Sequence, residues 1–398
     1  MNSPSASKVQ KVPAILSGAH SPASSASSSS SGSCDPAQYR VWFNQGIAVA
    51  DAAGAVRQAD IASGARQLYV MLSQVDGRST ADRPASAAGD LSVAEPARSM
   101  PAQAYVDWCL SVCRANRVDL MVATYRRQAI ERRRPEFEQA GTRLLAPGPA
   151  SSMDLADSKD ACSQFLSRHG VAVPAWRTAS HVSELDEAYA DLKARSPLVC
   201  VKPVRGVGGI GFHLFREPGM APITGWMPAN ALIDYATFKR NWSSANKRPK
   251  LLVAEFLPGT ERSIDCLAHN GQLVGSVCRA KVGSVQIIEN TGPALASAAR
   301  ITQALGMTGL FNVQTKDALD GTPKLVEVNA RMSDGTRYSI QAGTILPYWA
   351  VLLALGLADP QDIPRPIDGL ELIPDASRIQ NQTPNIIAAL NFPRKDPS

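Results

Sequence analysis

Short apolar segments alternate with amphipathic stretches in the part of the chain that follows residue 35. Residues 40–43, 68–72, 119–124 and 143–146 have the length and apolar content of strands, and segments with helical spacing separate them. Strands that alternate with helices indicate a parallel sheet flanked by helices. The pattern therefore predicts an α/β domain over residues 35–150, in which residues 81–101, rich in Ala, Ser and Pro, form a long surface loop.

A second region follows Pro147 and Pro149. The pattern predicts a helix over residues 157–169, an exit at residues 170–174, and strand-rich sequence to about residue 328, with helices near 229–240 and 293–305. Because strands here follow one another closely, the fold class is α/β with additional antiparallel sheet. We place this second domain at residues 151–365 and a C-terminal extension at 366–398.

Residues 1–34 are dominated by serine and contain no acidic residue before Asp35. Such a segment buries too little apolar surface to fold alone, so we expect a disordered leader. Its composition also resembles the leader of bacterial type III secreted effectors, and a linker without function is the alternative.

Composition narrows the partners and the compartment. The net charge of +6 suits an anionic substrate, but the arginine cluster in residues 126–134 is interleaved with Glu131 and Glu136, which is typical of a solvated helix face. No aromatic-plus-basic pattern accompanies it, so we expect no nucleic-acid partner. Seven cysteines without CxxC pairs favour reduced thiols and a cytoplasmic location. The longest apolar run, residues 345–358, contains Pro347 and is shorter than the roughly 20 residues that cross a bilayer, so no membrane partner is expected.

A glycine-rich hairpin follows the predicted strand 199–203. Lys202 lies at the end of this strand, and the loop beyond it carries closely spaced glycines, namely Gly206, Gly208, Gly209 and Gly211. Backbone N–H groups of such a loop can approach phosphate oxygens, and a lysine at its edge adds positive charge. A flexible hairpin without a ligand is the alternative.

An apolar strand interrupted by Pro258 and Gly259 forms the next candidate. The interruption exposes backbone groups of Phe256 and Leu257 between two carboxylates, Glu255 and Glu261. Exposed backbone of this kind can read the edge of a base, and a nearby carboxylate can accept ribose hydroxyl groups. A surface turn flanked by glutamates is the alternative.

The segment 311–331 contains the most informative pattern. Asp320-Gly321 predicts a two-residue hairpin turn. Counting outward from that turn pairs Gln314 with Glu327 and Asn312 with Asn329. Strand alternation then places Gln314, Glu327 and Asn329 on one face. It places a set of apolar residues on the other, namely Phe311, Val313, Val326 and Val328.

One carboxylate and two amide oxygens are the hard donors that Mg²⁺ prefers, and Arg331 adds a counter-charge for a polyphosphate. We therefore predict a metal site formed by Gln314, Glu327 and Asn329. A solvent-facing hairpin is the alternative, although such hairpins more often carry Lys, Thr and Glu.

Together these motifs resemble the ATP-grasp superfamily, especially the synthetase domains of the carbamoyl-phosphate synthetase large subunit, over residues 157–338. The resemblance implies a Rossmann-like pre-ATP-grasp domain over residues 35–150 and a two-lobed ATP-grasp domain over 151–365, with antiparallel sheets and a lid at about 175–255. The chain is too short for both synthetase halves of that enzyme, so its activity is not transferred. Ala330 stands where many relatives have proline.

The resemblance also implies a role for each candidate residue. Lys159 and Lys202 would contact the nucleotide phosphates under a glycine-rich lid, Glu255, Phe256 and Leu257 would form the adenine hinge, and Glu261 would bind the ribose. Gln314, Glu327 and Asn329 would hold one or two Mg²⁺ ions, with Mn²⁺ as a substitute. Arg331 would steady the phosphoryl group in transfer, and Arg279 would contact phosphate or substrate. The turn Ser333-Asp334-Gly335-Thr336 would face the second substrate.

The implied reaction is ATP-dependent ligation, in which a small-molecule carboxylate is activated as an acylphosphate and an amine or other nucleophile displaces phosphate. Two alternatives remain open at this point, a phosphotransferase that stops after phosphoryl transfer and a nucleotide-binding regulatory or effector protein without turnover. The expected partners are thus a small-molecule carboxylate and an amine, and a homodimer is compatible with the sequence.

Overall fold

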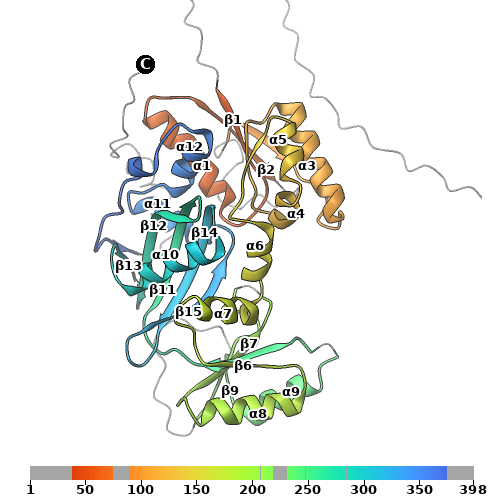
Figure 1. Ribbon diagram of the computed structural model, residues 1–398, viewed down its shortest axis with the longest axis vertical. Coiled ribbons are helices and arrows are strands. Elements are labelled where there is room, and N and C mark those ends of the chain that lie inside the picture. The colour runs from red at the N-terminus through yellow and green to blue at the C-terminus, as the bar shows by residue number, and fades with distance from the viewer. Residues whose placement is uncertain are drawn as a thin grey trace, which may run out of the picture. The chain divides into compact units, whose positions relative to one another are not determined.

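Three β-sheets organise the chain in the computed structural model, which describes residues 38–74, 89–206, 208–217, 231–246, 248–283 and 285–373 (Figure 1). The predicted leader and residues 374–398 of the predicted C-terminal extension lie outside these ranges. The described residues belong to one compact unit. The predicted boundaries at residues 150 and 365 stay predictions.

The first sheet is parallel, with strand order β3-β2-β1-β4-β5. Its strands are β1 (Tyr39–Phe43), β2 (Leu68–Gln74), β3 (Leu91–Ala94), β4 (Leu120–Val122) and β5 (Arg143–Leu145). Trp42 packs into a different core cluster from Val41 and Phe43, because alternate residues point to opposite faces. Both faces are therefore covered, as parallel sheets require.

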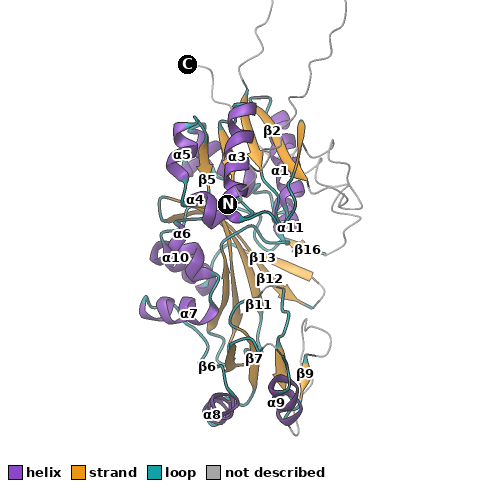
Figure 2. Cartoon of the chain, turned by 90° about the vertical axis from the view of Figure 1, so that its right-hand side faces the viewer, coloured by secondary structure: helices purple, strands orange, loops and turns teal. Residues whose placement is uncertain are grey.

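Helices cover the two faces of this sheet (Figure 2). Helix α1 (Val49–Ala62) packs in the cluster of Val41 and Phe43, and α3 (Ala102–Asn116) packs in the cluster of Trp42. Helices α4 (Arg127–Glu131) and α5 (Arg134–Gln139) connect β4 to β5 within this sheet. Helices α6 (Ala150–Ala156) and α7 (Lys159–Arg168) lead from β5 to the next sheet.

The second sheet has the order β6-β10-β7-β8-β9 and is mostly antiparallel, since only β8 and β9 pair in parallel. It is built from β6 (Trp176–Ala179), β7 (Val199–Pro203), β8 (His213–Phe215), β9 (Leu232–Ile233) and β10 (Leu251–Glu255). Helices α8 (Val182–Lys193) and α9 (Tyr235–Ser243) lie on one face of it (Figure 1). These elements span residues 176–255, and the predicted lid at about 175–255 stays a prediction.

The third sheet is antiparallel, with the order β15-β14-β11-β12-β13-β16. Its strands are β11 (Glu261–His269), β12 (Gln272–Val282), β13 (Val285–Glu289), β14 (Gly309–Asp317), β15 (Pro323–Asn329) and β16 (Glu371–Leu372). The remaining elements are α10 (Pro293–Leu305), α11 (Thr336–Gln341), α12 (Leu346–Leu355) and the short 3₁₀ helix η1 (Pro360–Asp362). The apolar side chains of the third sheet belong to the same core clusters as those of the first sheet, so these two sheets pack together.

The predicted fold class, α/β with added antiparallel sheet, is confirmed. The predicted helix 157–169 is confirmed as α7 (Lys159–Arg168). Two local predictions are corrected, because the predicted loop 81–101 contains β3 and the helix near 229–240 runs from Tyr235 to Ser243. A short strand such as β3 was missed because Ala and Ser dilute its apolar pattern. Among the described residues, no helix is both long enough and apolar enough to span a membrane.

Candidate functional site

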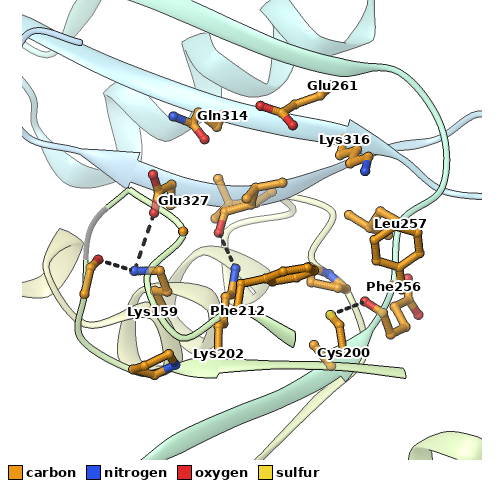
Figure 3. Close-up of a pocket in the computed structure, with 18 of the residues that line it drawn as sticks. Lys159, Cys200, Lys202, Phe212, Phe256, Leu257, Glu261, Gln314, Lys316 and Glu327 are labelled. Atoms are coloured by element: carbon orange, nitrogen blue, oxygen red, sulfur yellow. Dashed lines mark hydrogen bonds and ion pairs between the residues drawn. The ribbon is translucent and has the colours of Figure 1, made fainter. Parts of the chain in front are cut away.

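Two adjoining cavities lie between the sheets. The first, of about 190 Å³, lies between β7 and β10 of the second sheet and β14 and β15 of the third (Figure 3). The second, of about 290 Å³, lies beside α4 and the carboxyl end of β15. Both are lined by Lys159, Gly206 and Glu327, so these residues mark the junction. Two larger cavities, of about 480 and 610 Å³, lie elsewhere and contain none of these three residues.

The β14–β15 hairpin sets the position of the predicted metal ligands. Gln314 pairs with Glu327 and Asn312 pairs with Asn329, as the sequence predicts. The predicted two-residue turn is wrong, however, because Pro323 pairs with Asp317 and the turn spans residues 318–322. A bulge after Gln314 offsets this longer turn and restores the register.

The bulge changes the environment of two apolar residues. Val326, predicted on the core face, lines the first cavity, while Leu325 packs in the core at 3% exposure. Asn312 is fully buried, and its Nδ2 donates to Ser263 Oγ, the Ile264 carbonyl and Asp265 Oδ1. Asn312 is therefore part of the support beneath the site.

Glu327 is the centre of a polar group at the junction. Its Oε2 lies 3.4 Å from Lys159 Nζ, and its Oε1 accepts a hydrogen bond of 3.0 Å from Asn329 Nδ2. Arg331 donates to Asn329 Oδ1 at 3.1 Å. Burial lowers the pKa of Arg331, and the charge of Arg127 acts in the same direction while that of Glu327 opposes it. Thus two predicted metal ligands, a predicted phosphate lysine and the predicted transfer arginine are brought together.

The second predicted phosphate lysine lies inside the first cavity. Lys202 extends from β7 and donates from Nζ to the Val326 carbonyl at 3.2 Å (Figure 3). Burial lowers its pKa, and the charge of Lys159 adds to that effect, whereas Cys200 and Glu327 oppose it. Because the buried ammonium of Lys202 has one carbonyl as its hydrogen-bond partner among the described residues, it is well suited to bind a phosphate oxygen as well.

The glycine-rich loop covers the junction. Gly206 accepts a hydrogen bond of 2.8 Å from Lys159 Nζ, and Gly206 and Gly209 line the first cavity. Gly208, Gly209 and Gly211 have φ values of +66°, +72° and +76°, a region that other residues rarely adopt. A Cβ at Gly211 would also lie 2.9 Å from Pro203 Cγ. Three of the four predicted glycines, Gly208, Gly209 and Gly211, are thus required by this backbone path.

The predicted adenine hinge forms one end of the first cavity. The N–H groups of Glu255 and Phe256 are committed, since they donate to the carbonyls of Ala175 and Leu198 at 3.0 Å. The Glu255 carboxylate pairs with Lys324. Within the described part of the chain, no backbone carbonyl accepts the N–H of Leu257, which leaves this donor for a base edge.

Glu261 also lines the first cavity and pairs with Lys281. Sequence reasoning missed Lys316, which lies two residues beyond Gln314 on the same face of β14 and has its Nζ 4.6 Å from the centre of the Phe256 ring. Burial lowers the pKa of Lys316, opposed by the charge of Glu261. The period of two along β14 was the signal that would have found it.

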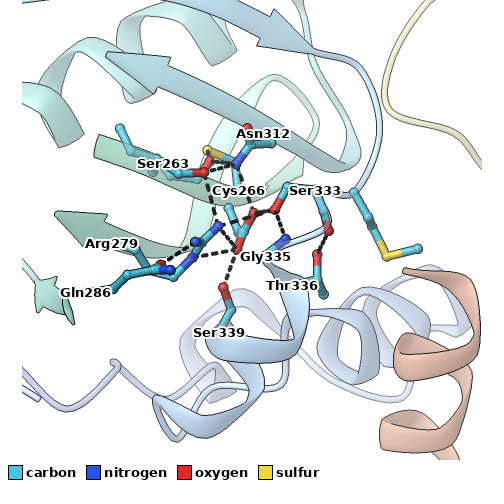
Figure 4. A network of polar contacts seen from close by, with 12 residues as sticks. Ser263, Cys266, Arg279, Gln286, Asn312, Ser333, Gly335, Thr336 and Ser339 are labelled. Carbon is cyan, nitrogen blue, oxygen red and sulfur yellow. Dashed lines mark hydrogen bonds and ion pairs between the residues drawn. The ribbon is translucent and has the colours of Figure 1, made fainter. Parts of the chain in front are cut away.

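Arg279 lies in a buried polar network rather than in either set of cavity-lining residues (Figure 4). It is 2% exposed and donates to Gln286 Oε1 at 2.6 Å, Ser263 Oγ at 3.0 Å and Asp265 Oδ2 at 3.2 Å. Asp265 also accepts from Ser333 and Ser339. The network therefore supports the turn 333–336 from below. The predicted contact of Arg279 with phosphate or substrate stays a prediction.

The arginine cluster in residues 126–134 divides into two groups. Arg132, Arg133 and Arg134 form surface ion pairs with carboxylates, as predicted for a solvated face. Arg127 instead lines the second cavity, where it forms an ion pair of 2.8 Å with Asp157. Its partner residues are far away in the sequence, so no local pattern identified it.

The donors at the junction fit a hard divalent cation. Glu327 supplies carboxylate oxygens, and Gln314 and Asn329 supply amide oxygens, with Gln314 directly across the ladder from Glu327. Among the described residues, no group of three or more His, Cys, Asp or Glu side chains is arranged to hold a metal. A single carboxylate with two amides suits a cation that also takes ligands from phosphate oxygens.

Comparisons of sequence place this arrangement among known proteins. Residues 247–374 match the family model described as "ATP-grasp in the biosynthetic pathway with Ter operon". The chain is 28% identical over 175 residues to carnosine synthase 1 of Gallus gallus, in an alignment that covers 38% of this chain and 18% of that protein. It is 24% identical over 225 residues to the carbamoyl phosphate synthase large chain of Pyrococcus furiosus, in an alignment that covers 51% of this chain and 19% of that protein. The chain thus matches less than a fifth of either relative's length.

Solved structures share the fold at low sequence identity. A biotin carboxylase domain of Hydrogenobacter thermophilus 2-oxoglutarate carboxylase, in complex with MgADP, gives a TM-score of 0.57 at 13% identity, covering 81% of this chain and 70% of that one. An ADP complex of N5-carboxyaminoimidazole ribonucleotide synthetase gives 0.57 at 14%, covering 84% and 80%. An L-amino acid ligase from Bacillus licheniformis gives 0.54 at 15%, covering 83% and 76%. The solved structures show that the chain shares this fold, and the matched family model with the two sequence relatives places the chain in the ATP-grasp superfamily.

Proposed function

We propose that this chain is an ATP- and Mg²⁺-dependent ligase that activates a small-molecule carboxylate as an acylphosphate for attack by an amine or another nucleophile. One observation carries the proposal: Lys159, Gly206 and Glu327 are shared by two cavities, so a nucleotide in the first would direct its terminal phosphate toward a substrate in the second. The known ligases among the fold relatives support this class of reaction.

The first cavity has a matching group for each part of ATP. The N–H of Leu257 would bind the base, Glu261 would bind the ribose, and Lys202 and Lys159 would bind the phosphates, since all four residues line this cavity. Gln314, Glu327 and Asn329 would hold Mg²⁺, which when bound neutralises phosphate charge and orients the terminal phosphoryl group. One or two ions, or Mn²⁺, are compatible with this donor set.

The residues of the chain act mainly by positioning and by charge. Lys202, Lys159 and Arg331 stabilise the negative charge that spreads over the phosphoryl oxygens during transfer. A substrate carboxylate oxygen attacks the terminal phosphorus, forming an acyl–phosphate bond while ADP leaves. The amine nitrogen then attacks the acyl carbon, inorganic phosphate leaves with the C–O electron pair, and the amine loses a proton to solvent. The glycine-rich loop excludes water from the acylphosphate.

A screen of acid and amine pairs tests the proposal, with ADP, phosphate and amide measured together. A ligase releases ADP and free phosphate in equal amounts only when acid and amine are both present, and forms amide in the same amount. ADP formation without free phosphate, together with a phosphorylated product, would replace ligation by phosphotransfer. ATP binding without ADP formation across the screen would support a protein without turnover.

A further inference from the structure

Arg127 occupies a special position in the first sheet. It is the first residue of α4, the helix that follows β4, and β4 lies beside β1, the central strand of the order β3-β2-β1-β4-β5. The connections run in opposite directions on either side of the β1–β4 pair, and ligands of open parallel sheets commonly bind at the carboxyl ends of strands at such a point. Arg127 lines the second cavity from this edge, whereas Glu327, Asn329 and Arg331 line it from the end of β15.

Arg127 is held in place but retains unused donors. Its side chain is 14% exposed, and one terminal nitrogen lies 2.8 Å from Asp157 Oδ1. Gln128 Nε2 donates to the other oxygen of Asp157 at 2.6 Å, which fixes that carboxylate. Arg127 Nε is buried without a hydrogen-bond partner. A guanidinium oriented by one carboxylate, with donors left over, is prepared to bind a second anion.

The second cavity has an excess of positive charge. Four cations line it, Arg127, Lys159, Arg205 and Arg331, against the two carboxylates of Asp157 and Glu327. These carboxylates contact Arg127 and Lys159. Arg331 and Arg205 form no ion pair with a carboxylate of the described residues. Two guanidinium groups, Arg127 and Arg331, therefore face one cavity from separate elements without a carboxylate shared between them.

We infer that Arg127 binds a second anionic group of the acid substrate, so that the substrate class is a small acid with two anionic groups, of which the one nearer Arg331 and Glu327 is activated. This inference rests on the proposed function. Each guanidinium is a two-pronged receptor for one carboxylate or phosphate, and the two receptors line the same cavity from separate elements, α4 and the segment after β15. An acid with one anionic group would leave Arg127 without a ligand.

A matched set of acids tests this inference without turnover. The complex of the full chain with MgADP is titrated calorimetrically with succinate and glutarate, and with butyrate and valerate, which have equal carbon number but one carboxylate. We expect the dicarboxylates to bind about tenfold or more tightly, and Arg127→Gln to remove that preference. Arg132→Gln is the control, because Arg132 belongs to the same stretch but pairs with Asp154 at the surface.

Two further readouts separate the possible outcomes. Arg127→Gln should leave the MgADP affinity and the melting temperature at the parental values. If Arg127 served only in its ion pair with Asp157, the substitution would instead lower the melting temperature and leave the acid preference unchanged. Equal binding of monocarboxylates, a preference that survives Arg127→Gln, or no acid binding at all would overturn the inference while MgADP binding still stood. Failure of the parent to bind MgADP would instead overturn the proposed function on which it rests.

Discussion

Lys159 and Glu327 contact each other at the junction of the two cavities, with Nζ 3.4 Å from Oε2 (Figure 3). One residue is a candidate phosphate ligand and the other a candidate metal ligand, and in this structure each neutralises the other. When nucleotide and metal bind, Lys159 would contact the phosphate and Glu327 would contact the metal in place of each other. The pair therefore keeps both charges satisfied before the substrate arrives.

Glu327→Ala should abolish turnover and leave the fold intact. Its side chain is 20% exposed and its backbone lies in the middle of a ladder, so the loss removes a charged ligand and little packing. Phosphate release and circular dichroism measure the two effects. Glu138→Ala, which removes a carboxylate 56% exposed at the surface, is the matched control. Near-parental rates in Glu327→Ala would count against the metal assignment.

Nucleotide affinity should depend on pH through Lys202. Because burial lowers its pKa, Lys202 loses its proton at a pH below the ordinary value of 10.5. Bound phosphate favours the charged form of Lys202. Above the lowered pKa, nucleotide binding must therefore be accompanied by protonation of Lys202, so the nucleotide affinity falls as the pH rises through that pKa. Below that pKa the lysine is charged in both states and its contribution is complete.

Titrations of MgADP from about pH 7 to 10 measure this effect. An arginine at position 202 stays charged over the whole range, so the MgADP affinity of Lys202→Arg should fall less with rising pH than that of the parent. Lys202→Ala should bind MgADP more weakly than the parent at the lower pH values. A parental affinity that stays constant over the range would argue against a phosphate contact by Lys202.

Sequence alone predicted much of the site because its key residues lie close together in the chain. Gln314 and Glu327 belong to one hairpin, so period-two alternation and a turn were enough to pair them. The turn was nevertheless wrong, and the pairing survived because the bulge after Gln314 offsets the longer turn. A bulge has no strong signature in one sequence, so only the coordinates show it.

Other parts of the site depend on contacts that no local pattern encodes. Arg127 lies in a stretch whose neighbours are surface arginines, and its approach to Arg331 depends on how the first and third sheets pack. The position of Arg279 along β12 is compatible with a site residue, but the turn 333–336 covers its side chain. Period and spacing describe a face of a strand, whereas what covers that face is a tertiary property.

Arg279→Met should destabilise the fold. The substitution leaves Asp265, 4% exposed, without its cationic partner, and loss of one partner of a buried ion pair costs about 3–5 kcal/mol. Urea denaturation measures the cost. The double variant Arg279→Met/Asp265→Asn should lose less than the sum of the two single variants, because no buried charge remains unpaired. Full additivity would show that the two side chains are not coupled.

The final prediction concerns two valines that alternation alone assigns to the same face. Val313 is fully buried in the core, whereas the bulge turns Val326 into the first cavity beside Lys202. Val313→Asp should prevent stable folding, because an unpaired charge in a core is costly. Val326→Asp should fold, since its side chain is only half-buried, but bind MgADP more weakly because the new carboxylate repels phosphate and neutralises Lys202. Denaturant unfolding and MgADP titration of both variants separate the two environments. If Val326→Asp unfolded like Val313→Asp, or bound nucleotide as the parent does, Val326 would belong to the core and the bulge would be misplaced.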